Sequence, residues 1–415
     1  MVSALGLSGQ ETWDALLSGK KGISAITGFD PRGFNCRVAA QVKGLNPSEL
    51  NIHPRDDRIM NTHSYLLLKS CREAYIQASV KKSKIPGEDV GFFVGMGMVD
   101  YEIDDLLPAV LKSKSSSGKI DYDAFYSRGY QEIFPLWPLS MLNNISFCQV
   151  SIDLGIKGEN AVFSPHADSC LQAINEARQT LIEHKAKLVL AGGVSEKISP
   201  SSLSRASYFG LLNTSDTNGK ATCLPFGEGR NGTVLGEGCG IITLELRSSA
   251  EARHALPLAA VTGYGSAFER ERGHNAPTVR AISLAMEKAL ASAEIHASEI
   301  DLLVAHGDGT IIGDRNEAEA IHRVFTECLD EVVVYSSKGA LGHTLAGAPA
   351  MDTILGMYIL KKGIIPAVDD SLPEDKNFRF RLARGKPTEK TVQRIMVNAR
   401  SFEGQCASLI LETAD

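Results

Sequence analysis

Short apolar runs alternate with amphipathic segments along the whole chain, and this alternation limits the fold more than any other feature. The clearest amphipathic segment, 279–293, carries Val279, Ile282, Met286 and Leu290 at the spacing of a helix with one buried face. Strands and helices in alternation favour mixed sheets covered by helices, an α/β layered fold. We expect strands at 90–98, 161–163, 188–193, 239–246, 256–261, 300–305, 332–335, 395–398 and 407–411, and helices at 65–78, 279–293 and 351–360.

The composition is that of a large globular protein. A chain of 415 residues, of which 43% are hydrophobic and 22% charged, can bury a large core in two domains or one of double size. The polar stretch 247–254 is the best internal boundary, so we expect one half over residues 1–247 and another over residues 254–415.

Charge and hydropathy exclude several kinds of partner. The formal charge of -6 gives no indication of binding to nucleic acid or to an acidic membrane surface. No apolar run approaches the ~20 residues that span a bilayer, and the first residues lack the pattern of a signal peptide. We therefore expect a cytoplasmic protein. The eight cysteines stand singly, without C-x-x-C pairs, so we expect neither a metal site nor a disulfide framework.

Three segments carry side chains suited to chemistry. Residues 158–170 (GENAVFSPHADSC) read as a strand, a tight turn and the start of a helix, and Ala167 lies at that helix N-terminus. The dipole and free N–H groups there would stabilise a thiolate or an oxyanion, but alanine offers no bond-forming atom. Two glycine-rich turns, each expected to follow a strand, carry His306 (AHGDGT) and His343 (SSKGALGHT).

These segments, together with 226–240, resemble the β-ketoacyl-carrier-protein synthases, the condensing enzymes of fatty acid and polyketide synthesis. The resemblance covers nearly the whole chain. It implies a thiolase-like fold of two similar halves, each a mixed five-stranded sheet flanked by helices, in α-β-α-β-α layers. It also implies no cofactor beyond the phosphopantetheine that an acyl carrier protein supplies in trans.

The family's pattern places its nucleophilic cysteine on Ala167, so covalent catalysis is missing here. His306 and His343 fall on the family's other two catalytic positions, where neutral imidazoles stabilise an oxyanion or enolate. The resemblance implies that Lys338 and Glu317 orient and tune them. A lone histidine would more often be structural, but two in their motifs indicate active-site positions, functional or vestigial.

Further departures affect the rest of the acyl site. The family's H-G-T-G-T motif, whose first threonine binds the pantetheine arm, here has Asp308 and then Thr310; Asp308 is an anion that needs a partner if buried. The family's loop N-S-F-G-F-G-G-T-N corresponds to NARSFEGQC at 398–406. Phe402 keeps the position that gates the tunnel. Ser401 and Glu403 replace glycines that permit unusual dihedrals, so a hinged loop is in doubt.

Other residues near Ala167 are poor substitutes for the lost nucleophile. Cys170 lies about one helical turn further on, ~4.5 Å along the axis, and suits a packing role better. His166 and Asp168 flank Ala167 and could form a charged pair. Residues 1–6 correspond to the end of the family's first strand, so part of a central strand is absent and we expect a longer natural protein.

The region 100–154 differs from the rest, with a flexible tract at 112–119 followed by aromatic residues. The resemblance implies that it caps the acyl tunnel and contributes to a dimer contact. Phe134 and Trp137 are the first candidates for tunnel-lining side chains. The alternative is a surface excursion with a small core of its own.

Two functions compete. The first is a chain length factor, a cysteine-less partner that forms a heterodimer with an active ketosynthase in type II fatty acid or polyketide synthesis. The pair would receive chains from an acyl carrier protein, and this subunit would shape the shared tunnel. A polyene is the favoured product. The second is a malonyl-carrier-protein decarboxylase, because His306 and His343 could stabilise an enolate without a thiolate. The three altered parts of the acyl site favour the first.

Overall fold

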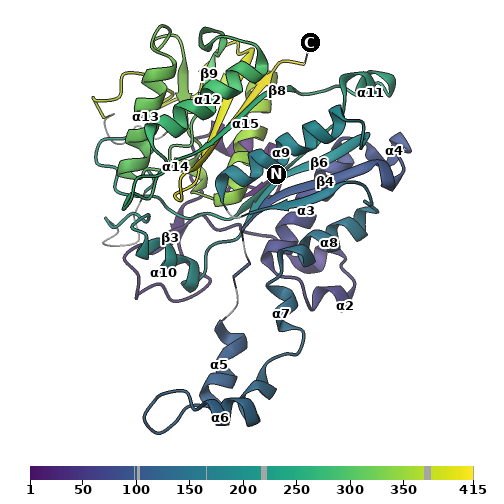
Figure 1. Ribbon diagram of the computed structural model, residues 1–415, viewed down its shortest axis with the longest axis vertical. Coiled ribbons are helices and arrows are strands. Elements are labelled where there is room, and N and C mark those ends of the chain that lie inside the picture. Colours follow the sequence, from purple (N-terminus) through teal and green to yellow (C-terminus); the bar gives the residue numbers. More distant parts are fainter. Residues whose placement is uncertain (98, 101–102, 165, 216–221, 369–374, 415) are drawn as a thin grey trace.

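The computed structural model describes residues 1–97, 99–100, 103–164, 166–215, 222–368 and 375–414. Two sheets form the centre of the molecule, with helices between them and on their outer faces (Figure 1). Among the described residues, no helix has the length and apolar character needed to cross a bilayer.

The two main sheets share one strand order and one set of directions. In each sheet, the first strand in chain order lies at an edge and pairs antiparallel with the last, the last pairs antiparallel with the one before it, and the remaining pairs are parallel. This repetition confirms the expected thiolase-like fold of two similar halves. The first sheet is β1 (Val2–Ser3), β7 (Gly238–Leu244), β6 (Leu188–Ser195), β4 (Val90–Met96) and β5 (Asn160–Phe163). The second is β8 (Ala260–Phe268), β15 (Gln405–Glu412), β14 (Arg394–Arg400), β9 (Leu302–Val304), β10 (Val333–Tyr335) and β12 (Arg381–Leu382).

Three details differ from the sequence expectations. The second sheet has six strands instead of five, because the two-residue β12 pairs with β10. β12 is too short to give an apolar run that would predict it from the sequence. The strand at the start of the chain, β1, lies at a sheet edge and not at its centre. β8 covers 260–268 instead of 256–261, because Gly263 and Gly265 interrupt the apolar pattern. A β-carbon on either glycine would lie within 2.4 Å of a carbonyl oxygen of the covering helix, so close packing requires glycine there.

Helices complete the five expected layers. α9 (Ala167–Ile182) and α15 (Ala348–Lys362) each contact both sheets and form the middle layer. α3 (Thr62–Gln77) and α8 (Asn143–Leu154) cover the first sheet, and α12 (Val279–Ala293) covers the second, with α13 (Ile311–Val324) packed beside α12. The N-terminus of α9, which carries Ala167, therefore lies inside the molecule. The other elements are α1 (Gly9–Leu17), β2 (Ser24–Ala25), β3 (Val38–Ala39), η1 (Pro47–Leu50), α2 (Pro54–Asp57), α4 (Val80–Ser83), η2 (Gly87–Asp89), α10 (Pro200–Tyr208), α11 (Arg247–Ala252), η5 (Ala297–Glu299), α14 (Lys338–Leu341), η6 (Leu345–Gly347), β11 (Ile364–Ile365) and β13 (Thr388–Glu389).

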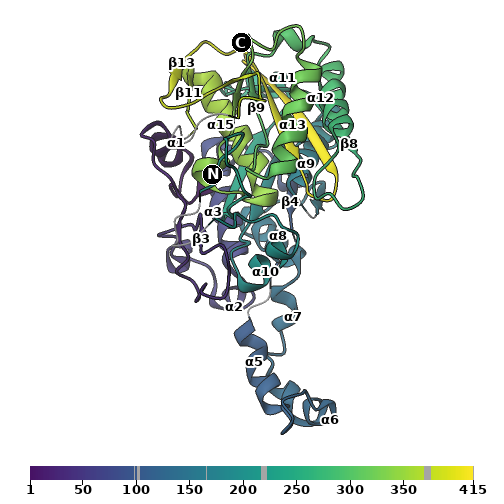
Figure 2. The ribbon, with the colours of Figure 1, turned by 90° about the vertical axis from the view of Figure 1, so that its left-hand side faces the viewer.

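An arm, residues 103–142, projects from the body (Figures 1 and 2). It has a small interior of its own, in which Ala109, Ser113 and Gly129 are buried, while many of its large apolar side chains face solvent. Whether it caps a tunnel or contributes to a dimer stays a prediction. Its helices are α5 (Ile103–Lys112), α6 (Tyr122–Ala124), η3 (Phe125–Gly129), η4 (Tyr130–Glu132) and α7 (Trp137–Ser140). Its exposed apolar residues are Ile103, Leu107, Leu111, Ile120, Tyr122, Tyr126, Tyr130, Phe134, Leu136 and Leu142.

Candidate active site

Ala167 begins α9, and three residues separate it from the end of β5, as the strand–turn–helix pattern predicts. Pro165 in this turn lies outside the described residues. The side chain of Ala167 is 1% exposed and provides only a methyl group at the helix N-terminus. Cys170 is completely buried one turn further into α9, and burial raises the pKa of its thiol well above the usual value. A neutral, enclosed thiol is a poor nucleophile, which supports a packing role for Cys170.

His306 and His343 face each other across the site, with ring centroids 4.9 Å apart and planes at 85°. His306 follows β9, as expected, whereas the short helix α14 separates His343 from β10. Burial lowers the pKa of His343 to about 3 and that of His306 well below its usual value. Both imidazoles are therefore neutral near pH 7, the state in which they can donate a hydrogen bond to a developing oxyanion.

Two further predicted residues support these loops by different means. Glu317, on α13, accepts hydrogen bonds from the main-chain N–H groups of His306 (2.7 Å) and Gly307 (2.8 Å), so it fixes the loop that carries the first imidazole. Lys338 Nζ pairs with Asp352 Oδ2 at 2.8 Å, and both side chains are at most 1% exposed. The sequence did not point to Asp352. Lys338 thus acts on the imidazoles through its charge, which further lowers the pKa of both after the larger effect of burial.

Asp308 is buried, and its partner is Arg400, which the sequence reading missed. Arg400 Nη2 lies 2.7 Å from Asp308 Oδ1 and 3.0 Å from Asp314 Oδ1, and Nε lies 3.3 Å from Glu317 Oε2. One guanidinium therefore serves three carboxylates, all at most 9% exposed. Arg400 stands where the family loop has its first phenylalanine. The signal that could have found it is the unpaired charge of Asp308 itself, since a buried anion requires a cation.

The carboxylates of this cluster have different pKa values. Burial raises the pKa of Asp308, but the charge of Arg400 outweighs it and holds that pKa well below the usual value. Burial and the neighbouring charge of Asp308 raise the pKa of Asp314 to about 7. Asp308 is therefore ionised near neutral pH, while Asp314 is the site that takes up a proton.

The loop that follows Arg400 is tied to the turn before α9. His166 Nε2 pairs with Glu403 Oε1, and Ser401 Oγ donates a hydrogen bond to Asp168 Oδ1. The predicted charged pair between His166 and Asp168 is thus wrong, because each residue binds the facing loop instead. The ring of Phe402 lies 4.5 Å from that of His166, between centroids. These contacts hold Phe402, at the gate position, close to the N-terminus of α9, where Ala167 occupies the position of the nucleophile.

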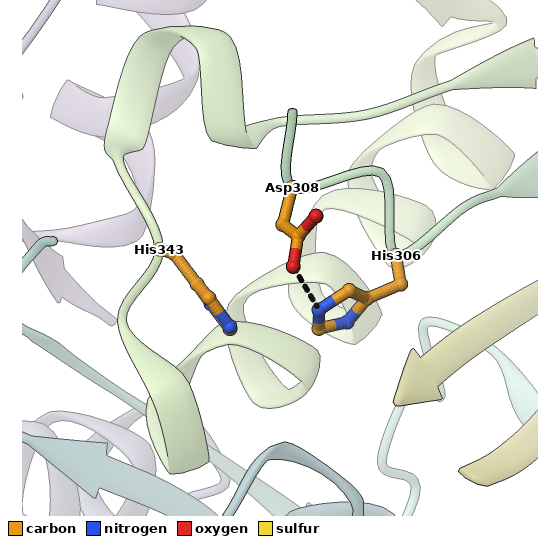
Figure 3. Close-up of side chains that lie close together, drawn as sticks. All are labelled: His306, Asp308 and His343. Carbon is orange, nitrogen blue, oxygen red and sulfur yellow. Dashed lines mark ion pairs between the residues drawn. The ribbon is translucent and has the colours of Figure 1, made fainter. Parts of the chain in front are cut away.

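His306, Asp308 and His343 offer three ligand atoms within 4.8 Å of one another (Figure 3). Two imidazoles and a carboxylate can hold a transition metal. Here, however, the main-chain N–H of Arg400 donates to His306 Nδ1 at 3.2 Å, which places the proton of the neutral ring on Nε2, the atom facing Asp308. A protonated nitrogen cannot ligate, so in this tautomer His306 Nε2 is a hydrogen-bond donor and not a metal ligand.

Phe134 and Trp137 lie elsewhere. They line a cavity of about 260 Å³ whose wall also includes Asp100, Glu196 and Glu237. Burial raises the pKa of Glu237 to about 7. No residue at the three catalytic positions lines this cavity, and its carboxylates make it more polar than an acyl tunnel requires. The tunnel-lining role of Phe134 and Trp137 stays a prediction.

Comparison with known proteins now identifies the class. Residues 1–250 match the Beta-ketoacyl synthase, N-terminal domain, and residues 258–370 match the Beta-ketoacyl synthase, C-terminal domain. The chain therefore belongs to the β-ketoacyl synthase family of the thiolase superfamily.

Within this family, the chain is 27% identical over 412 residues to 3-oxoacyl-[acyl-carrier-protein] synthase 2 of Staphylococcus aureus, covering 99% of this chain and 98% of the relative. It is 26% identical over 414 residues to the protein of the same name from Coxiella burnetii, covering 99% and 96%. Among solved structures, the ishigamide ketosynthase/chain length factor has the same fold, with a TM-score of 0.86, 24% identity and coverage of 100% and 97%. A β-ketoacyl synthase from Burkholderia phymatum gives a TM-score of 0.84 at 24% identity, with the same coverage.

Proposed function

We propose that this chain is a non-catalytic ketosynthase-like subunit, of the chain length factor type, which pairs with an active β-ketoacyl synthase in type II fatty acid or polyketide synthesis. The observation that carries the proposal is Ala167 at the N-terminus of α9, where condensation requires a thiolate. Cys170 is enclosed and protonated, so it does not replace the missing sulfur. The two imidazoles remain, but the nucleophile they would assist is absent.

The proteins similar to this chain support the substrate class. Its curated relatives are named 3-oxoacyl-[acyl-carrier-protein] synthase 2, and one solved structure of similar fold is a type II PKS acyl-carrier protein in complex with its ketosynthase bound to the hexaketide. The ishigamide structure joins a ketosynthase with a chain length factor. We infer that the complex formed by this chain acts on acyl groups carried on phosphopantetheine.

The surface supports a protein partner. The arm exposes large apolar side chains, including Leu107, Leu111 and Tyr126, at 42%, 59% and 71%. Many large apolar side chains exposed on one projecting segment are typical of an interaction site. β5, at the edge of the first sheet, leaves one side of the strand free to pair. An active ketosynthase of the same fold is the partner we propose for these surfaces.

Co-expression with an active ketosynthase from the same source tests the proposal. We expect a one-to-one heterodimer that survives size exclusion chromatography, because the arm buries its apolar side chains against the partner. Leu111→Glu, on the arm, should weaken the complex at least tenfold, about 1.4 kcal/mol. Leu256→Glu is the matched control, since Leu256 is 91% exposed on the body and should tolerate the same change. Separate elution of the two wild-type proteins would contradict the pairing.

The neutral histidine pair favours malonyl decarboxylation as the second candidate. Such an enzyme must place a malonyl carboxylate beside His306 and His343, where Asp308 already presents an anion. Like charges at this distance repel strongly in a buried site. We therefore expect carbon dioxide release from malonyl-carrier protein to stay at the rate of the protein-free control. Faster release, lost in His306→Ala, would favour the decarboxylase instead.

A further inference from the structure

The two oxygens of the Asp308 carboxylate have different surroundings. Oδ1 accepts hydrogen bonds from the Thr310 main-chain N–H (3.0 Å), the Thr310 hydroxyl (2.7 Å) and Arg400 Nη2 (2.7 Å). Oδ2 receives none of these and faces His306 Nε2 at 3.7 Å (Figure 3). The side chain is thus anchored through one oxygen and presents the other to the imidazoles.

Each imidazole could still form a further hydrogen bond. His306 Nε2 and His343 Nδ1 are enclosed by protein and make no hydrogen bond within the described part of the chain. Because His306 Nδ1 accepts from the main chain, Nε2 carries the proton and is a donor directed at the carboxylate. A buried donor without a full partner favours an anion beside it.

We propose that Asp308 is a built-in anion that fills a carboxylate-binding subsite formed by Arg400, Thr310 and His306, so that the wild-type protein accepts no external carboxylate there. Removing the Asp308 side chain opens this subsite to a small free carboxylate such as formate. The inference deepens the proposed non-catalytic role, on which it rests for its biological meaning, but its chemistry concerns only these side chains.

The size of the vacated space identifies the ligand. Asp308→Ala removes one carboxylate group and keeps the β-carbon, so the space left is that of one formate ion. The donors that hold Oδ1 belong to Thr310 and Arg400 and are not removed by the substitution. Arg400 is itself fixed by Asp314 and Glu317, so it stays close to its present position.

Thermal unfolding in sodium formate, compared with equal concentrations of sodium chloride, tests the proposal. Formate that binds only the folded state of Asp308→Ala should raise its Tm by roughly 2 °C or more above the chloride series. The wild-type protein should respond equally to the two salts, because its subsite is filled. Asp308→Asn is the matched control: the amide fills the same space without charge, so formate should have no specific effect.

The outcomes are distinct. Asp308→Gly, which also removes the whole carboxylate and leaves room for formate, provides a second variant if Asp308→Ala fails to fold. Equal Tm values in formate and chloride for a folded variant of either kind would overturn the proposal. So would a visible cobalt(II) spectrum in the wild-type protein that disappears in Asp308→Ala, because the carboxylate would then serve a cation. Neither result depends on whether a ketosynthase partner binds.

Discussion

Replacing Arg400 by alanine is expected to lower the free energy of unfolding by about 3–5 kcal/mol, the cost of leaving buried charges without their partner. Arg400 is 4% exposed on its side chain and contacts the carboxylates of Asp308, Asp314 and Glu317. Without the guanidinium, these groups must either remain charged in the core or take up protons. The loss should therefore grow as pH rises above the acidic range, and the midpoint of urea unfolding at several pH values measures it.

Arg394→Ala is the matched control for this prediction. Arg394 also pairs with two carboxylates, Glu299 at 3.0 Å and Glu412 at 3.1 Å, but its side chain is 30% exposed. Partly exposed ion pairs contribute about 0–1 kcal/mol. The prediction is contradicted if the two variants lose similar stability. Arg400→Ala combined with Asp308→Ala should recover part of the loss, because one uncompensated carboxylate is removed together with the arginine.

The layered fold and most positions of the candidate site can be predicted from the sequence. Strands and helices follow from local apolar periodicity, and Ala167 and His306 lie where their motifs place them. His343 faces His306 as well, although α14 separates it from β10. β8 lies at 260–268 and not at 256–261, because its glycines, Gly263 and Gly265, allow a helix to pack closely and give no apolar signal in the sequence. Such features depend on what packs against a segment, which a local pattern does not contain.

Arg400 was missed for a related reason. Asp308 and Arg400 are 92 positions apart in the sequence, so no local motif contains both. What connects the two residues is that a buried carboxylate requires a positively charged partner. Arg400 lies in the 398–406 loop, which already departs from the family pattern, and is the cation that Asp308 requires.

The departures from the family pattern occur in contacting pairs. Asp308 binds Arg400, His166 binds Glu403, and Asp168 accepts a hydrogen bond from Ser401. Asp308 alone would bury an unpaired charge, which Arg400 compensates, and Ser401 likewise gives the buried Asp168 a donor. His166 and Glu403 are partly exposed, at 19% and 34%, and their contact ties the two loops together. The site has therefore not merely lost a cysteine. Its loops are joined by polar contacts in a closed arrangement.

Closure of the site predicts that the thiol introduced by Ala167→Cys will react slowly. A thiol at the N-terminus of a helix has a lowered pKa and reacts rapidly when reagents can reach it. Ala167 is 1% exposed beneath the contact between His166 and Glu403, so we expect iodoacetamide to modify this position at least about tenfold more slowly than the exposed, native Cys148. Mass spectrometry of the digested protein measures both rates in one sample. For the same reason, we expect no acylation of this variant by an acyl-carrier protein.

The double variant Ala167→Cys with Glu403→Gly separates closure from chemistry. Glycine removes the partner of His166 and restores the residue that the family has at that position of the loop, so Phe402 is free to move with it. We expect the rate at position 167 to rise at least about tenfold, while that of Cys148 stays unchanged. Rapid modification of the single variant would mean that the polar contacts do not cover the nucleophile position. In that case the missing sulfur alone, and not a closed site, would separate this chain from a condensing enzyme.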